Sequence, residues 1–186
     1  MAQLTFITGN SGKLAEMQAF LPFVKGKKID LPEIQSVDTK EIVRAKLSSA
    51  VQLCDGPIIV DDTAFYMECF AGKNGFQELP GPLAKWFLKT IGNTGLAEIA
   101  YKLEKTKARA QTIIGYAPNK KDFYFFEGVT FGNVVAPQGT SGFGWDHIFV
   151  PRGFAQTFAK MGIEQKNKIS PRAQSAQKLK QFLNCN

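Results

Sequence analysis

The sequence predicts a single α/β domain, residues 1–186, built on a mixed β-sheet. Two observations carry this prediction: a strand, glycine turn and helix at the N-terminus, and a strand-rich second half that begins at Ala108. Residues 4–7 form a short apolar run typical of a buried strand. From residue 13 to residue 21 apolar side chains recur at helical spacing, and Pro22 ends the segment. The chain has the length of one domain with a substantial core.

The first turn, Thr8-Gly9-Asn10-Ser11-Gly12, has the composition of an anion-binding loop. Glycines let the backbone approach a phosphate, and a helix that begins here directs its N–H groups and its positive end at an anion. Lys13 adds a full charge in the first helical turn. The spacing is not that of a Walker A loop, which has four residues between its first glycine and its Gly-Lys pair. These residues alone fit a phosphate-binding turn and an ordinary strand-to-helix turn equally well.

Three segments follow the first helix. Residues 25–28 predict a solvated basic turn, and the proline-interrupted stretch 29–35 predicts an edge strand or an extended loop. Asp38 and Glu41 stand at the spacing of a capping box, which predicts a helix over 39–53.

A compact buried strand is predicted at residues 58–60, with Asp61, Asp62 and Thr63 at its carboxyl end and an aromatic, glycine-rich loop over 65–76 beyond. Ligands gather at the carboxyl ends of strands in open α/β sheets. Because side chains alternate along a strand, one carboxylate can face a ligand while the other caps or pairs behind it. The alternative is a helix N-cap and turn without a ligand.

The rest of the chain predicts helices first and strands second. Pro82 is placed as the first residue of one helix and Thr94 as the N-cap of another. Strands are predicted over residues 108–116, 123–127, 129–135 and 148–150. The first three of these strands are expected to form the antiparallel half of the sheet, and the aromatic run 123–126 is expected to pack on it rather than to stack on bases. In the terminal helix Ser170 is the expected N-cap and Pro171 the first helical residue.

Composition restricts the function classes. A net charge of +7 favours an acidic partner, but the sequence has no helix-turn-helix, zinc-finger or RNA-binding aromatic motif, and a phosphorylated small molecule explains the charge equally well. The single histidine, His147, excludes a histidine-rich zinc site, so any metal is expected to be a hard cation such as Mg²⁺. Three cysteines without a Cys-x-x-Cys motif suit reduced thiols in the cytoplasm. No apolar run approaches the roughly 18 residues of a membrane span.

A glycine-rich loop over residues 139–147 carries Phe143, Trp145 and Asp146. Aromatic faces can pack on a nucleobase, and the acid can accept hydrogen bonds from ring N–H or ribose hydroxyl groups. These residue types favour a binding loop over a purely structural one. Lys166 and Arg172 flank the start of the terminal helix, where they either decorate its surface or reach a ligand.

Taken together, these segments resemble the inosine triphosphate pyrophosphatase family, hydrolases of non-canonical purine nucleoside triphosphates. The matching pieces occur in the family's order over nearly the whole chain. They are Thr8-Gly9-Asn10 with Lys13, Leu31-Pro32-Glu33, Lys46, Val60-Asp61-Asp62-Thr63, Leu79-Pro80-Gly81-Pro82 with Lys85, Phe143-Gly144-Trp145-Asp146, and Lys166-Asn167. The resemblance implies an elongated mixed sheet flanked by helices, two lobes with an active-site cleft between them, and a homodimer.

The resemblance also implies a set of site residues. For substrate binding these are Thr8, Gly9, Asn10, Lys13, Lys46, Asp62, Thr63, Lys85, Phe143, Gly144, Trp145, Asp146, Lys166 and Arg172. The first loop and Lys13 would grip the triphosphate, and Lys46 and Lys85 would neutralise its charge. The loop 143–146, with Lys166 and Arg172, would enclose the base and the sugar.

The implied chemistry rests on two acids and a lysine. Glu33 and Asp62 would bind Mg²⁺, Asp62 would also orient or deprotonate the attacking water, and Lys13 completes the expected catalytic set. The implied reaction converts ITP, dITP or XTP and water into the monophosphate and pyrophosphate. A metal ion and fixed cations stabilise the charge that builds up on the phosphate oxygens in such a reaction.

One position departs from the family, which has Ser-His-Arg where this chain has Ser170-Pro171-Arg172. Pro171 suits a helix start but removes an imidazole and a backbone donor from the expected base pocket, so the sequence leaves the base selectivity open. His147, where the family commonly has proline, adjoins the same loop, and we hypothesise that it compensates. The alternative function is a nucleotide- or RNA-binding protein that kept the fold and lost turnover, although the intact acids and lysines argue against it.

Overall fold

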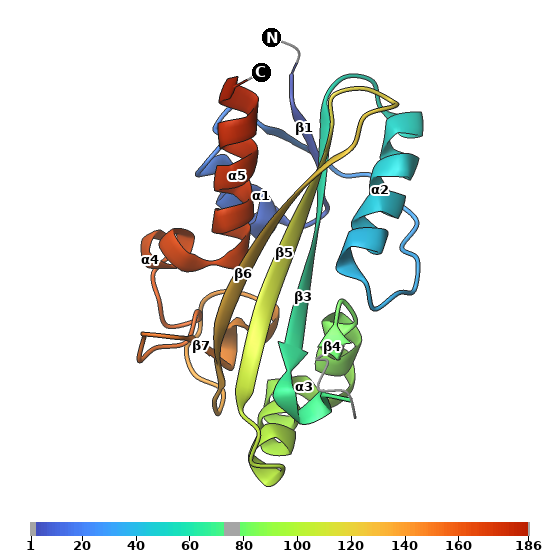
Figure 1. The fold of residues 1–186 in the computed structure, drawn as a ribbon. Coiled ribbons are helices and arrows are strands. Elements are labelled where there is room, and N and C mark those ends of the chain that lie inside the picture. The colour runs from blue at the N-terminus through green and yellow to red at the C-terminus, as the bar shows by residue number, and fades with distance from the viewer. Residues whose placement is uncertain (1–2, 73–78, 186) are drawn as a thin grey trace. The chain divides into compact units, whose positions relative to one another are not determined.

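The computed structural model describes residues 3–72 and 79–185 (Figure 1). The strands in this part of the chain are β1 (Thr5–Ile7), β2 (Lys25–Lys27), β3 (Ile58–Met67), β4 (Pro80–Gly81), β5 (Lys107–Ala117), β6 (Tyr124–Val134) and β7 (Phe149–Pro151). The α-helices are α1 (Ser11–Gln18), α2 (Thr39–Leu53), α3 (Ala84–Lys102), α4 (Ile163–Ile169) and α5 (Pro171–Cys185). Short 3₁₀ helices occupy Glu68–Phe70 and Gly144–His147.

The strands form one mixed sheet, which confirms the predicted fold class. Its order is β2-β1-β3-β5-β6-β7, and β4 pairs with β3. The pairs β1–β2 and β1–β3 are parallel, whereas β3–β4 and β6–β7 are antiparallel. Among the described residues, no helix combines the length and the apolar character that crossing a bilayer requires.

The chain divides into two compact units. Unit 1 comprises Met1–Thr63, Thr112–Gly128 and Ser170–Asn186, and unit 2 comprises Ala64–Gln111 and Val129–Ile169. The expectation of a single two-lobed domain over residues 1–186 stays a prediction.

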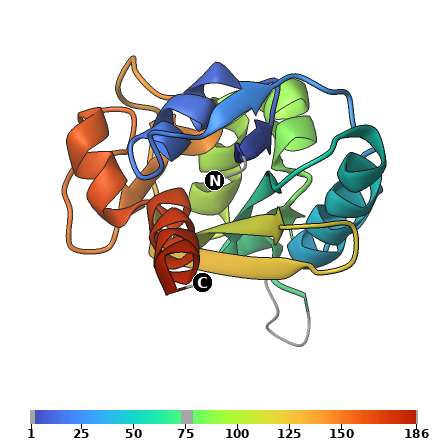
Figure 2. The same cartoon turned by 90° about the horizontal axis from the view of Figure 1, so that it is seen from above.

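Unit 1 packs helices on both faces of its strands. Ile58 and Val60 of β3 pack with Leu47 of α2, while Ile59 between them packs with Met17 of α1 on the other face. This division follows from the alternation of side chains along a strand. Figure 1 shows α2 and α5 on opposite sides of the unit 1 strands, and the view from above in Figure 2 again separates the two helices.

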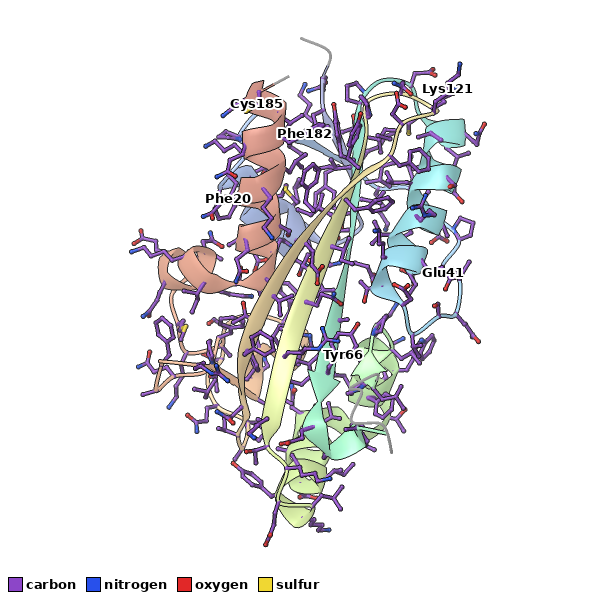
Figure 3. The ribbon with its side chains drawn as sticks, in the orientation of Figure 1. Phe20, Glu41, Tyr66, Lys121, Phe182 and Cys185 are labelled. Atoms are coloured by element: carbon purple, nitrogen blue, oxygen red, sulfur yellow. The ribbon has the colours of Figure 1, made fainter. Side chains whose placement is uncertain are left out.

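Aromatic side chains close the core of unit 1. Phe182 of α5 packs against Tyr116, Tyr124 and Phe126, with ring centroids 6.2, 4.7 and 5.4 Å away, and Figure 3 shows it on the side of α5 that faces the strands. The partly buried ring of Phe125 packs on the face that carries α2. The aromatic run 123–126 therefore packs on the sheet, as predicted.

Unit 2 has its own aromatic core around Phe149. The rings of Phe65, Trp145 and Phe158 lie 5.6, 5.5 and 5.3 Å from the Phe149 ring. Trp145 also stacks on Phe65 at 4.7 Å with an interplanar angle of 9°. This core fixes the 3₁₀ helix that carries Trp145.

Two strand predictions are corrected by the structure. β3 does not end at Val60 but runs to Met67, so Asp61 and Asp62 lie within a strand. The predicted loop over 65–76 is thus strand in its first three residues, and its part from residue 73 lies outside the described residues. Gly128 does not separate two strands but lies within β6, where a Cβ atom would meet the Pro171 carbonyl oxygen at 2.0 Å. This glycine permits a close approach rather than a turn.

Two further predictions, for the segments that form β2 and α3, differ from the structure. The basic turn predicted at 25–28 contains the strand β2, which the hydrophobic pattern could not indicate because its side chains are exposed. Helix α3 begins at Ala84 rather than at Pro82, and its range continues through Thr94 to Lys102. The two predicted helices instead meet at a kink at Gly92, whose φ of 67° favours glycine.

Candidate active site

The glycine turn between β1 and α1 is built as an anion-binding loop would be. Asn10 caps α1, because its Oδ1 accepts the N–H of Lys13 at 3.0 Å, and the Asn10 N–H donates to Thr8 Oγ1 at 3.1 Å. Gly9 and Asn10 are exposed. The first N–H groups of a helix have no acceptor within the helix, so this exposed end offers donors to a ligand.

Asp61 connects α1 to α5 in the interior of unit 1. Its Oδ1 lies 2.9 Å from Lys13 Nζ and its Oδ2 lies 3.0 Å from Arg172 Nε. The Arg172 guanidinium also pairs with Glu16 and donates to Thr63 Oγ1 at 2.9 Å. Arg172 and Glu16 are buried. Four charged groups therefore form one internal network: Asp61, Lys13, Arg172 and Glu16.

Lys46 of α2 joins two acids from separate segments. Its Nζ lies 2.8 Å from Asp62 Oδ1 and 3.0 Å from Glu33 Oε1. The Glu33 side chain is 62% exposed, whereas those of Lys46 and Asp62 are 10% and 16% exposed. Glu33 and Asp62 therefore meet at one cation, which the proposal of a shared metal ion requires.

Burial and charge shift the pKa values of these groups. Burial alone would raise the pKa of Asp61, but Lys13 and Arg172 outweigh it and lower that pKa to about 2. Burial raises the pKa of Asp62 despite its lysine partner. Burial would lower the pKa of Lys46, but Asp62 and Glu33 outweigh it and raise that pKa.

We call this set of charged side chains the unit 1 ion cluster. Its members are Lys13, Lys46, Arg172, Glu16, Glu33, Asp61 and Asp62. Three cations thus face four acids, so with every group ionised the cluster carries one net negative charge. An anionic ligand would meet a favourable potential here only with an additional cation.

The two acids around Lys46 fit a hard divalent cation. No group of three or more Asp, Glu, His or Cys side chains that could hold a metal occurs in residues 3–72 and 79–185. Mg²⁺, however, is usually held by one or two carboxylates together with waters and substrate phosphate oxygens. The Lys46 ammonium already lies between Glu33 and Asp62 as a cation would.

Unit 2 brings together the predicted base-binding residues. The Asp146 carboxylate lies 2.7 Å from Lys166 Nζ and accepts the Phe143 N–H at 3.0 Å. Lys166 Nζ also lies 4.8 Å from the centre of the Phe143 ring. Trp145 offers less aromatic surface than predicted, because one of its faces is stacked on Phe65.

The structure gives the positions of the three remaining residues, and their expected roles stay predictions. Lys85 lies on α3 with its Nζ 6.0 Å from the centre of the Trp86 ring. Arg172, expected at the base, belongs to unit 1 and is bonded to the groups described above. His147 Nδ1 lies 3.2 Å from the Gly139 carbonyl oxygen, so the imidazole contacts its own loop.

Two groups that support the site are not indicated by the sequence. Glu16 reads as a surface residue of α1, yet it is buried against Arg172. Asn93 Nδ2 donates to the Gly144 carbonyl oxygen at 3.0 Å and so supports the loop over 143–146. In the sequence, the only sign of polar residues on the inner face of α1 is the i, i+3 spacing of Lys13 and Glu16.

The fold is of the kind seen in solved Ham1 proteins. A Ham1 protein from Coxiella burnetii superposes with a TM-score of 0.83 at 24% identity, and the match covers 100% of both chains. The Ham1 family model matches residues 4–182. An inosine triphosphate pyrophosphatase of Scheffersomyces stipitis is 37% identical over 98% of each chain, and inosine triphosphate pyrophosphatase 2 of Trypanosoma cruzi is 42% identical over 96% of this chain and 90% of its own. This chain belongs to the Ham1 family, which confirms the resemblance seen in the motifs.

Proposed function

We propose that this protein is a nucleoside triphosphate pyrophosphatase that hydrolyses non-canonical purine nucleotides such as ITP, dITP and XTP. The products would be the nucleoside monophosphate and pyrophosphate. The names of its relatives support the substrate class. The observation that carries the proposal is the meeting of Glu33 and Asp62 at one cation position in unit 1.

The residues of unit 1 would handle the phosphates. The exposed N–H groups at the start of α1 and the Lys13 ammonium would hold phosphate oxygens, and Thr63, whose Oγ1 accepts a hydrogen bond from Arg172, would contribute its hydroxyl. Such donors stabilise charge best when they are fixed before the reaction, as Lys13 is by Asp61. Lys46 would release its acids and turn to the phosphates.

Asp62 would take the proton of the attacking water. Its pKa is raised by burial, which brings the carboxylate closer to the basicity that a general base needs at neutral pH. Mg²⁺ bound by Glu33 and Asp62 would neutralise charge on the phosphate oxygens. The residues of unit 2, from Phe143 to Asp146 with Lys166, would bind the base, and Lys85 would neutralise phosphate charge.

The decisive experiment identifies the products of ITP hydrolysis. We expect pyrophosphate and IMP, no activity with EDTA, and a loss of about 100-fold or more in kcat for Asp62→Asn and Glu33→Gln. Asp30→Asn, an exposed acid in the same loop as Glu33, is the control and should keep full activity. Release of orthophosphate would contradict the proposed reaction. Salt-dependent RNA binding without turnover would favour the alternative of a nucleotide- or RNA-binding protein.

We infer further that the protein acts in the cytoplasm as a homodimer. The free cysteines Cys54, Cys69 and Cys185 suit a reducing compartment. Light scattering at several protein concentrations would test the dimer.

A further inference from the structure

The two lysines expected to hold phosphate in unit 1 are both neutralised within the protein. Lys13 is paired with Asp61, and Lys46 with two carboxylates. The unit 1 ion cluster as a whole carries one net negative charge. A further unpaired cation close to the glycine turn would therefore strengthen the attraction for a polyphosphate tail.

Lys28 is held beside this turn by the backbone. It directly follows β2, whose residue Lys27 is in register with Ile7 at the end of β1. The Lys27 carbonyl oxygen accepts the Thr8 N–H at 3.1 Å. The stem of Lys28 runs along Gly9, since a Cβ atom at Gly9 would lie 3.9 Å from both Cγ and Cε of Lys28.

The alternation of the chain explains why Lys28 reaches the turn. Gly26 faces α1, because a Cβ atom there would lie 2.5 Å from Leu14 Cδ2. Lys27 faces the other way, and its Nζ lies 3.3 Å from Cys54 Sγ at the end of α2. Because successive residues of an extended chain point to opposite faces, Lys28 returns to the face of α1, where the glycine turn lies.

The charge of Lys28 is available. The residue is exposed, and no hydrogen bond or ion pair joins it to any residue in 3–72 or 79–185. Its carbon stem is placed by Gly9 while its ammonium stays in water, the usual arrangement of a lysine at a surface. An unpaired ammonium next to exposed helix N–H groups is a point charge suited to a phosphate.

We propose that Lys28 is a further polyphosphate-binding residue, which adds an unpaired positive charge to the glycine turn, where Lys13 is paired with Asp61. The proposal rests on the proposed function, because it assigns the glycine turn to the phosphate tail of the substrate. Lys28 binds the tail and takes no part in proton transfer.

The test compares Lys28→Met with Lys25→Met. Both variants remove one exposed lysine from the same segment, but Lys25 shares the face of Lys27, away from the turn. Calorimetric titration with inorganic tripolyphosphate should show binding weakened roughly five- to tenfold in Lys28→Met and unchanged in Lys25→Met. The KM for ITP should rise by the same factor with kcat nearly unchanged, and Lys28→Arg should retain most of the affinity.

The inference is overturned if Lys28→Met binds tripolyphosphate as the wild type does, or if Lys25→Met weakens binding equally. It is also overturned if the wild type does not bind tripolyphosphate. The thermal midpoint of each variant should equal that of the wild type, because both lysines are exposed. A wild type that binds tripolyphosphate but releases no pyrophosphate from ITP would contradict the proposed function alone, since the calorimetric comparison would still decide the role of Lys28.

Discussion

Asp61 and Asp62 are neighbours in sequence, yet their carboxylates serve opposite faces of β3. Asp61 Oδ1 lies 2.9 Å from Lys13 Nζ on the side of α1, and Asp62 Oδ1 lies 2.8 Å from Lys46 Nζ on the side of α2. Two adjacent acids in one strand thus form ion pairs with lysines from two different helices. The buried member of the pair organises the network, and the partly exposed member remains accessible to a ligand.

Replacing Asp61 with Asn should change the acid stability of the protein. Lys13 and Arg172 outweigh burial and lower the pKa of Asp61 from 3.8 to about 2. A carboxyl whose pKa is lowered by folding stabilises the native state above its ordinary pKa, and this contribution is lost as the pH falls from near 4 to near 2. It amounts to roughly 2 kcal/mol. Urea unfolding at several pH values measures it.

The Asp61→Asn variant should be less stable than the wild type at pH 6, and its free energy of unfolding should fall less steeply below pH 4. Asp55→Asn is the control, because the Asp55 side chain is 97% exposed. Equal slopes for the wild type and Asp61→Asn below pH 4 would show that the buried charge network is not formed.

A double-mutant cycle should show that Asp61 acts on substrate binding through Lys13. The two side chains are bonded to each other, so their effects should not add. Asp61→Asn should raise the KM for ITP in the wild type but not in a Lys13→Met background. We expect a coupling energy of about 1 kcal/mol. Additive effects in the four proteins would mean that Asp61 affects binding by another route.

Removing Lys46 should strengthen the binding of Mg²⁺ in the absence of substrate. The Lys46 ammonium contacts the same Asp62 and Glu33 oxygens that the metal would use, so the two cations compete. Lys46→Met should therefore show a larger rise in melting temperature with Mg²⁺ than the wild type does, although its turnover of ITP should fall. Lys40→Met, at an exposed position of the same helix, is the control.

The size of the Mg²⁺-dependent rise in melting temperature shows whether Lys46 and the metal compete for the same oxygens. A variant that shows no Mg²⁺-dependent rise at all would mean that Glu33 and Asp62 do not form a metal site. A rise equal to that of the wild type would mean that the lysine and the metal use different oxygens.

Gly142→Ala should disturb the ion pair of unit 2. Gly142 has a φ of +81°, and a Cβ atom there would lie 2.5 Å from Asp146 Oδ2. The substitution thus adds a clash to a backbone strain of about 1–3 kcal/mol. Gly153→Ala is the matched control, since Gly153 has a φ of +86° and nothing within 4 Å of the added atom. A larger loss of melting temperature for Gly142→Ala isolates the clash.

Helix α2 shows what a sequence can predict. Its predicted bounds agree with the structure because two independent signals coincide: apolar spacing along the helix, and Asp38, whose Oδ1 accepts the N–H groups of Lys40 and Glu41 at 2.7 and 3.3 Å. The start of α5 is similar, since Ser170 Oγ accepts the Ala173 N–H at 3.1 Å. Helix caps depend on residues close together in the chain, so short sequence motifs predict them.

Strand β2 and the ion cluster show what a sequence does not reveal. β2 is held by backbone pairing with β1, and its Lys-Gly-Lys residues carry no apolar pattern. Glu33 and Lys46 read as ordinary surface residues in their own segments, and only the family resemblance indicated that they meet Asp62. The buried pair of Glu16 and Arg172 joins two helices that are far apart in sequence, so no local pattern could predict it.

The ion pair of Asp146 and Lys166 should influence the choice of base. Asp146 and Lys166 form an ion pair whose side chains are only 3% and 8% exposed. Loss of one partner would leave a buried charge and destabilise unit 2 by about 3–5 kcal/mol. The double variant Asp146→Asn/Lys166→Met removes both charges and should fold better than either single variant. If this loop binds the base as proposed, the double variant should have a lower ratio of kcat/KM for ITP to kcat/KM for GTP than the wild type.

The affinity for tripolyphosphate provides the internal control for this variant, because that ligand has no base. It should stay at the wild-type value, whereas the ITP-to-GTP ratio changes. Lys160→Met, an exposed lysine of the same unit, should change neither quantity. A folded double variant with an unchanged ratio would remove Asp146 and Lys166 from base recognition and leave their ion pair a structural role only.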